Sequence, residues 1–156
     1  MLKFISVIGA ANARGKEYDN ALEVGREIAR HKAVLVCGGL GGVMEAAAKG
    51  AKEAGGITVG IIPGNSNKGV NPFIDIPIIT GLGEARNIIV VLSADCVIAV
   101  GGELGTLSEL AFALKHKKPV IGIGTWNLDK DYCDKVNIIV VSTAKEAVEK
   151  AFSLIG

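Results

Sequence analysis

Residues 97–109 read Val97-Ile98-Ala99-Val100-Gly101-Gly102-Glu103-Leu104-Gly105-Thr106-Leu107-Ser108-Glu109. This pattern predicts a short buried strand, a glycine-rich turn and a helix that opens at Thr106. Such a turn directs the free N–H groups of the helix start toward the edge of a sheet, where they and the helix dipole favour an anion such as phosphate. Thr106 adds a hydroxyl group, and Glu109 adds a carboxylate one helical turn later.

A second turn of the same kind occurs earlier, in Val34-Leu35-Val36-Cys37-Gly38-Gly39-Leu40-Gly41-Gly42-Val43-Met44. Gly38, Gly39, Gly41 and Gly42 are more glycines than a turn requires, and a close approach of the backbone to a ligand explains the surplus. Both glycine turns follow apolar strands. We therefore expect a small phosphorylated ligand to be held between them.

Composition predicts one domain that spans residues 1–156. The chain is 49% hydrophobic but only 4% aromatic, which favours a core of Val, Ile, Leu and Ala in parallel strands covered by helices. A net charge of +1 gives no general attraction to nucleic acid, and the apolar N-terminus is too short to cross a membrane. The three cysteines lack a CxxC spacing, so we expect reduced thiols in a cytoplasmic protein.

Apolar segments of strand length alternate with segments of helical spacing along the whole chain. The expected strands are 4–8, 33–37, 58–62, 76–80, 96–100, 119–123 and 137–141, and the expected helices are 21–31, 43–54, 85–93, 106–117 and 143–154. The segment 63–75, rich in Gly, Pro, Asn and Ser, is expected to be a long loop. The sum is an α/β fold: a doubly wound, mostly parallel, Rossmann-like sheet with helices on both faces and a ligand site at the carboxyl ends of its strands.

Several familiar site motifs fail in this sequence. Glu17 stands where a P-loop needs Ser or Thr for magnesium, and Met44 stands where a dinucleotide fingerprint needs its third glycine. His31 and His116, the two histidines, both fall near the ends of expected helices, where a cation is favoured. We therefore expect no P-loop, no NAD site and no metal site.

The stretch from Gly101 to Glu109 resembles the GGxGTxxE signature of the LOG (LONELY GUY) family, and the turn from Gly38 to Met44 resembles the upstream glycine turn of that family. Arg86 stands where the family has its arginine. The resemblance covers nearly the whole chain and is closer still to a branch of small proteins that includes the molybdenum cofactor carrier proteins. LOG proteins were long mislabelled lysine decarboxylases and are phosphoribohydrolases, so no lysine decarboxylase activity is expected.

The sequence departs from the LOG pattern in the phosphate turns and beside the arginine. Val100 and Asn87 stand where LOG proteins usually have proline and lysine, and Glu45 stands where they usually have glycine. Two functions follow from the resemblance and stay open. One is a carrier or sensor of a phosphorylated nucleotide-like ligand, with no required cofactor and with the molybdenum cofactor as cargo. The other is a phosphoribohydrolase that cleaves a nucleoside 5′-monophosphate to free base and ribose 5-phosphate.

The resemblance implies a set of site residues. Arg86 and Glu109 carry the catalytic roles, if the protein is an enzyme, and the ligand-binding residues are Gly38, Gly39, Gly41, Gly42, Gly101, Gly102, Gly105, Thr106 and Asn12. Each has a structural alternative. Thr106 and Glu109 have the spacing of a helix capping box, and Arg86 has the acidic neighbour Glu84 as a candidate ion-pair partner.

The residues after Arg86 are apolar on almost every side of the expected helix 85–93, which predicts that this helix is buried. A buried guanidinium needs a partner, and a phosphate group is a natural one. The apolar helix also favours an interface between copies of the chain. We therefore expect a homodimer or a homotetramer, in which a second chain lies close to the site.

Overall fold

The structure is a computed structural model that describes residues 1–156. Seven parallel strands form one sheet in the order β4-β3-β2-β1-β5-β6-β7. The strands are β1 (Phe4–Gly9), β2 (Val34–Cys37), β3 (Ile57–Ile62), β4 (Ile76–Ile79), β5 (Cys96–Val100), β6 (Val120–Ile123) and β7 (Ile138–Val140). The expected doubly wound fold is confirmed, and the sheet is parallel throughout rather than mostly so.

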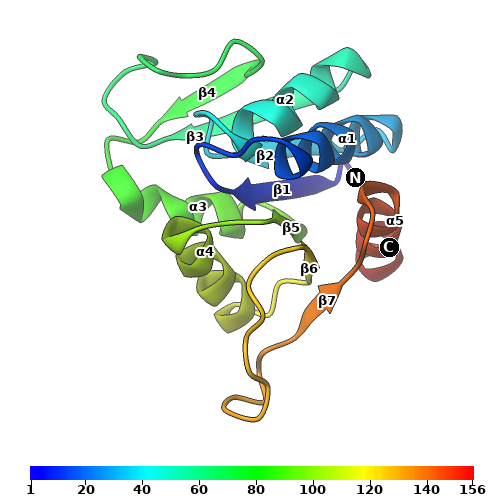
Figure 1. The fold of residues 1–156 in the computed structure, drawn as a ribbon. Coiled ribbons are helices and arrows are strands. Elements are labelled where there is room, and N and C mark those ends of the chain that lie inside the picture. Colours follow the sequence, from blue (N-terminus) through cyan, green and yellow to red (C-terminus); the bar gives the residue numbers. More distant parts are fainter.

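Helices cover both faces of the sheet (Figure 1). They are α1 (Lys16–Arg30), α2 (Val43–Glu53), α3 (Arg86–Leu92), α4 (Leu104–Lys115) and α5 (Ala144–Ile155), and the short 3-10 helix η1 (Gly83–Ala85) precedes α3. One apolar core lies between the sheet and α1, α2 and α5, and a second lies between the sheet and α3 and α4. Both cores consist mainly of Ile, Val, Leu and Ala, as the composition predicts.

The order of the strands reverses between β1 and β5, and this reversal marks the expected position of a ligand site. From β1 the chain winds outward through β2 and β3 to β4, and then crosses back to β5 on the other side of β1. The carboxyl ends of β1 and β5 are therefore the topological switch point, where open α/β sheets usually bind their ligands. No helix of the chain combines the length and the apolar character that a membrane span requires.

Two predicted helix starts are wrong. The first helix begins at Lys16 rather than at residue 21, and α4 begins at Leu104 rather than at Thr106. In α4 the N-cap is Glu103, and the Thr106 hydroxyl accepts a hydrogen bond from the Glu103 N–H at 3.3 Å. The capping box is therefore formed by Glu103 and Thr106. The Glu109 side chain takes no part in capping the helix.

The prediction that the helix after Arg86 is buried holds only in part. Only Arg86, Val90 and Val91 of α3 are buried, and Leu92 is 44% exposed. The helix covers the sheet on one side only, and its other side faces outward. By contrast, the capping interaction of Thr143 is confirmed, because its hydroxyl accepts from the Glu146 N–H at 3.2 Å.

Candidate functional site

A cavity of about 370 Å³ opens at the switch point, at the carboxyl ends of the strands. Its walls come from five places in the chain that are far apart in sequence: the end of β1, the turn after β2, the end of β3, the start of α3 and the first turns of α4. The lining residues are Val7, Ile8, Gly9, Ala10, Ala11, Gly38, Leu40, Met44, Pro63, Gly83, Glu84, Arg86, Asn87, Glu103, Gly105, Thr106 and Glu109. The volume falls within the range of small-molecule sites.

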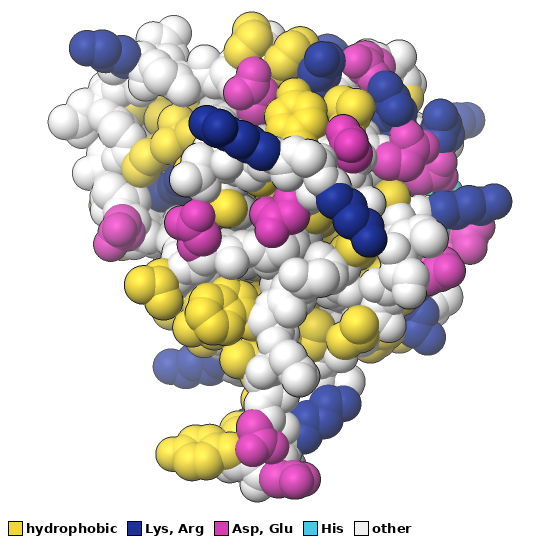
Figure 2. Space-filling view, viewed as in Figure 1, with side chains coloured by type: hydrophobic (Ala, Val, Ile, Leu, Met, Phe, Trp, Pro, Cys, Tyr) yellow, Lys and Arg dark blue, Asp and Glu magenta, His cyan; other side chains and the backbone are white.

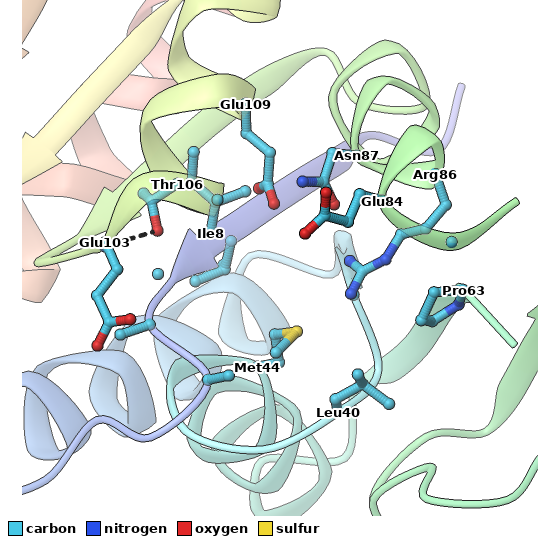
Figure 3. A pocket seen from close by; sticks show the side chains of 17 residues that line it. Ile8, Leu40, Met44, Pro63, Glu84, Arg86, Asn87, Glu103, Thr106 and Glu109 are labelled. Atoms are coloured by element: carbon cyan, nitrogen blue, oxygen red, sulfur yellow. Dashed lines mark hydrogen bonds between the residues drawn. The ribbon is translucent and has the colours of Figure 1, made fainter.

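Five of the predicted site residues line this cavity, namely Arg86, Glu109, Gly38, Gly105 and Thr106. The two predicted catalytic side chains, from α3 and α4, therefore share one cavity (Figure 3). The sequence could not establish this, because the two residues lie on separate helices whose packing had to be known.

The other predicted residues lie outside the cavity lining, namely Gly39, Gly41, Gly42, Gly101, Gly102 and Asn12. The side chain of Asn12 is exposed and makes no hydrogen bond within the chain. Against Gly101 lies the carboxylate of Glu17, which comes from the first turn of α1. An anion above that turn would thus meet a like charge.

Contacts within the chain account for much of the glycine surplus. At Gly38 a methyl group would overlap the guanidinium of Arg86 and the sulfur of Met44. Gly42 has a φ of +63° and a methyl group there would overlap the carbonyl oxygen of Ala10. These glycines thus let Arg86 and the β1–α1 loop approach the backbone closely. The surplus of glycines was expected to make room for a ligand, but here it makes room for other parts of the chain.

The first turns of α2 and α4 both border the cavity, through Met44 and Gly105 respectively. The N–H group of Val43, which opens α2, donates to the carbonyl of Ala10 at 3.0 Å. The N–H groups of Met44, Leu104 and Gly105 have no acceptor within the chain. Two helix N-termini therefore keep free donors at the same cavity, where the helix dipoles favour negative charge.

Arg86 is buried, with 8% of its surface exposed, yet its guanidinium makes no hydrogen bond and no ion pair within the chain. Its Nε is a buried donor without an acceptor. Burial lowers the pKa of Arg86, and the nearby Glu109 and Cys37 act in the opposite direction. The alternative considered for Arg86, an ion pair with Glu84, does not form, so the side chain is available to an anionic ligand.

Glu109 is the second unpaired ionisable group of the cavity. Its side chain is 9% exposed and its oxygens accept no hydrogen bond within the chain. Burial raises the pKa of Glu109 to about 7, although the Arg86 guanidinium opposes this shift. Near neutral pH the group can therefore hold or release a proton. The arrangement provides a cation and a titratable carboxyl group that do not neutralise each other.

The remaining polar groups of the cavity are acidic or amide side chains. Glu84 and Glu103 line it from η1 and from the start of α4, and both are exposed. Figure 2 shows separate acidic side chains (magenta) in a row near the region where α3 and the start of α4 lie in Figure 1, with hydrophobic and other atoms between them. No sequence motif marks Glu84 as a lining residue, because its place at the cavity depends on how η1 packs beside α4. No three His, Cys, Asp or Glu side chains gather in the chain as the ligands of a metal ion would.

Replacement of Glu109 by glutamine tests its raised pKa. Below about pH 4.5 the carboxyl group is protonated in both the folded and the unfolded chain, and above about pH 7 the folded chain bears a buried charge. The stability that protonated Glu109 contributes is therefore complete below pH 4.5 and is lost as the pH rises through 7. We expect Glu109→Gln to be more stable than the wild type at pH 8 by on the order of 3 kcal/mol, with the difference approaching zero at pH 4.5.

Urea unfolding of both proteins at pH 4.5, 6 and 8 measures this difference. Glu149→Gln serves as the control, because Glu149 is exposed on α5 in an ion pair with Lys145 and its replacement should have a small effect at every pH. A stability difference for Glu109→Gln that stays constant across this pH range would contradict the raised pKa.

Comparison with known proteins agrees with this fold. The chain is 40% identical to the molybdenum cofactor binding protein of the phototrophic bacterium Rippkaea orientalis, with a TM-score of 0.94 over 100% of this chain and 99% of that one. It is 38% identical to the Moco carrier protein of Chlamydomonas reinhardtii, with a TM-score of 0.86 over 99% of this chain and 98% of that one. An uncharacterized protein of Archaeoglobus fulgidus is 50% identical over 119 residues, which are 76% of this chain and 78% of that protein. The profile of the SLOG cluster4 family matches residues 2–150. The resemblance inferred from the two glycine turns is therefore confirmed, and the chain belongs to the SLOG cluster4 family.

Proposed function

We propose that this protein binds a phosphorylated, ring-bearing small molecule in the cavity at the switch point and carries it without chemical change. The observation that carries this proposal is Arg86, a buried guanidinium without any partner in the chain. A buried charge is costly unless it is paired, and a phosphate group can accept two parallel hydrogen bonds from a guanidinium. The free N–H groups at the starts of α2 and α4 complete an anion site.

The two similar structures named for the molybdenum cofactor indicate the cargo. That cofactor joins a pterin ring system to a phosphate group, so it matches a cavity with apolar walls and a cationic end. The walls supply Ile8, Leu40, Met44 and Pro63 for a flat ring, and Arg86 supplies the charge. We propose the molybdenum cofactor as cargo, held by the side chains of the cavity and with no further cofactor required.

Replacement of Arg86 tests the anion site. We expect Arg86→Ala to weaken the binding of GMP at least tenfold, because charge-assisted hydrogen bonds contribute about 1.5–3 kcal/mol each. Arg86→Lys should restore part of the affinity, since it keeps the charge and loses the planar fork. Isothermal titration calorimetry measures the affinity, and the molybdenum content after gel filtration reports whether added molybdenum cofactor stays bound.

The control is Arg14→Ala, since Arg14 is an exposed arginine in the β1–α1 loop and lies outside the cavity lining. Its affinity for GMP should stay within about twofold of the wild type. Equal affinities of wild type and Arg86→Ala would show that the phosphate group does not meet Arg86.

Glu109 supports a second candidate, the phosphoribohydrolase. A carboxyl group with a pKa of about 7, buried and unpaired in the cavity, suits a general acid or a stabiliser of the positive charge that develops on a ribosyl group as its glycosidic bond breaks.

If this reaction occurs, the wild type releases free base from AMP or GMP, and Glu109→Ala lowers the rate at least a hundredfold. Chromatography of the reaction mixtures measures the release. Tight binding without free base supports the carrier, and release that persists in Glu109→Ala excludes Glu109 from the chemistry.

The proposal also includes a homo-oligomer that forms through edge strand β4. Ile76, Ile78 and Ile79 of this strand are between 41% and 49% exposed, and Leu82, which follows the strand, is exposed as well. An uncovered apolar edge strand favours association with another chain. Because η1 follows β4 closely and lines the cavity, a partner on this edge would lie near the ligand.

Sedimentation velocity tests this interface. The wild type should sediment as a dimer or tetramer of the 16.1 kDa chain, and Ile78→Lys should shift it toward the monomer. Val140→Lys is the matched control, because Val140 is 76% exposed on β7 at the opposite edge of the sheet. A wild-type monomer, or equal effects of the two substitutions, would contradict an interface at β4.

A further inference from the structure

The polar side chains of the cavity offer many more hydrogen-bond acceptors than donors. Three carboxylates line the cavity, those of Glu84, Glu103 and Glu109, and only one guanidinium, that of Arg86. The amide of Asn87 already donates a hydrogen bond to the Ser108 hydroxyl at 3.3 Å. Ionised carboxylates can only accept hydrogen bonds. A ligand that brings its anionic group to Arg86 must therefore present N–H donors elsewhere on its surface.

Glu109 differs from the other two carboxylates in its burial. Glu84 and Glu103 are exposed and remain hydrated, whereas Glu109 is 9% exposed and has no hydrogen-bond partner. Figure 3 shows the Glu109 side chain entering the cavity from α4, while Arg86 enters from α3. Because Glu109 is the most buried of the three carboxylates and has no partner within the chain, a ligand that donates to it gives up the least hydration in return.

We propose that Glu109 selects ligands whose ring edge carries two adjacent donors, an N–H beside an amino group, as guanine and the pterins do. This inference rests on the proposed binding function and specifies the ring that the cavity accepts. An ionised carboxylate accepts both donors of such an edge in parallel, one on each oxygen. Adenine presents an amino group beside a ring nitrogen that bears a lone pair, and that lone pair would face a carboxylate oxygen without a proton between them. Discrimination therefore comes from a repulsive contact as well as from an attractive one.

Ligand binding of this kind involves a proton. A doubly donating edge needs the ionised form of Glu109, so at a pH below about 7 the proton on Glu109 must pass to solvent when the ligand binds. The ionisable groups that face Glu109 are Arg86 on α3, the Cys37 thiol on β2, and Glu84 and Glu103 at the cavity rim. Arg86 stays charged, and burial raises the pKa of Cys37 to about 12, so neither titrates between pH 6 and 8.

Calorimetric titration of the wild-type protein with GMP, IMP and AMP tests the inference. The three nucleotides share ribose and phosphate and differ in the ring edge: GMP has both donors, IMP lacks the amino group, and AMP has one donor beside a lone pair. At pH 8 we expect GMP to bind at least tenfold more tightly than AMP, with IMP between them. At pH 6 the ratio of the two affinities should fall severalfold, and the ratio removes the contribution of the phosphate, which both nucleotides carry.

Two variants identify the residue responsible. Glu109→Gln replaces one acceptor by a donor, so its amide can pair with adenine as well as with guanine, and we expect the preference for GMP over AMP to disappear at both pH values. Glu149→Gln is the control: it removes a carboxylate from an exposed position on α5, outside the cavity lining, and the preference for GMP over AMP should stay within about twofold of that of the wild type.

The possible results separate this inference from the function on which it rests. Tight but equal binding of GMP and AMP by the wild type would overturn the selection by Glu109 and leave the phosphate site at Arg86 standing. A preference for GMP that persists in Glu109→Gln would also overturn it. No binding of any of the three nucleotides would overturn both the inference and the proposed anion site.

Discussion

The structure of the site depends on a buried guanidinium that the protein itself leaves unpaired. Arg86 lies at the start of α3 with its Nε lacking any acceptor, and Glu109 lies in the same cavity without a hydrogen bond. An ion pair between these two groups would satisfy both, yet they stay apart. Such an arrangement costs stability, and a ligand that fits between the groups recovers that cost on binding.

The electrostatics of the cavity are more restrictive than its glycine turns suggest. Glu84 and Glu103 border the opening, and the Glu17 carboxylate lies against the neighbouring turn at Gly101, outside the lining. Only Arg86 and the free N–H groups at the starts of α2 and α4 favour an anion. The phosphate group of a ligand thus has one favourable place, and its position would also fix the orientation of the rest of the molecule.

The fold was predictable because its signals are local and repeated. Alternating apolar strands and amphipathic helices identified all seven strands, and the low aromatic content agreed with a core of small aliphatic side chains.

The first residues of the helices were less predictable than the strands. Thr106 has the residue type of an N-cap, but the extended backbone of Glu103 allows that residue to take the position, and Thr106 instead accepts the Glu103 N–H from the third position of the helix. A hydrophobic run such as that of α3 also does not reveal which of its sides the sheet will cover.

The sequence by itself determined the doubly wound architecture and nominated the two glycine turns, Arg86 and Glu109, because strand periodicity and short motifs are properties of neighbouring residues. Only the tertiary structure decided that Arg86 and Glu109 share a cavity, that Gly38 makes room for the guanidinium, and that Gly39, Gly41 and Gly102 lie outside the lining. These facts depend on how α3 and α4 pack on one face of the sheet and on the position of the turn after β2, which lines the same cavity as these two helices. Burial and charge pairing arise from such long-range contacts, and no local pattern of residues contains them.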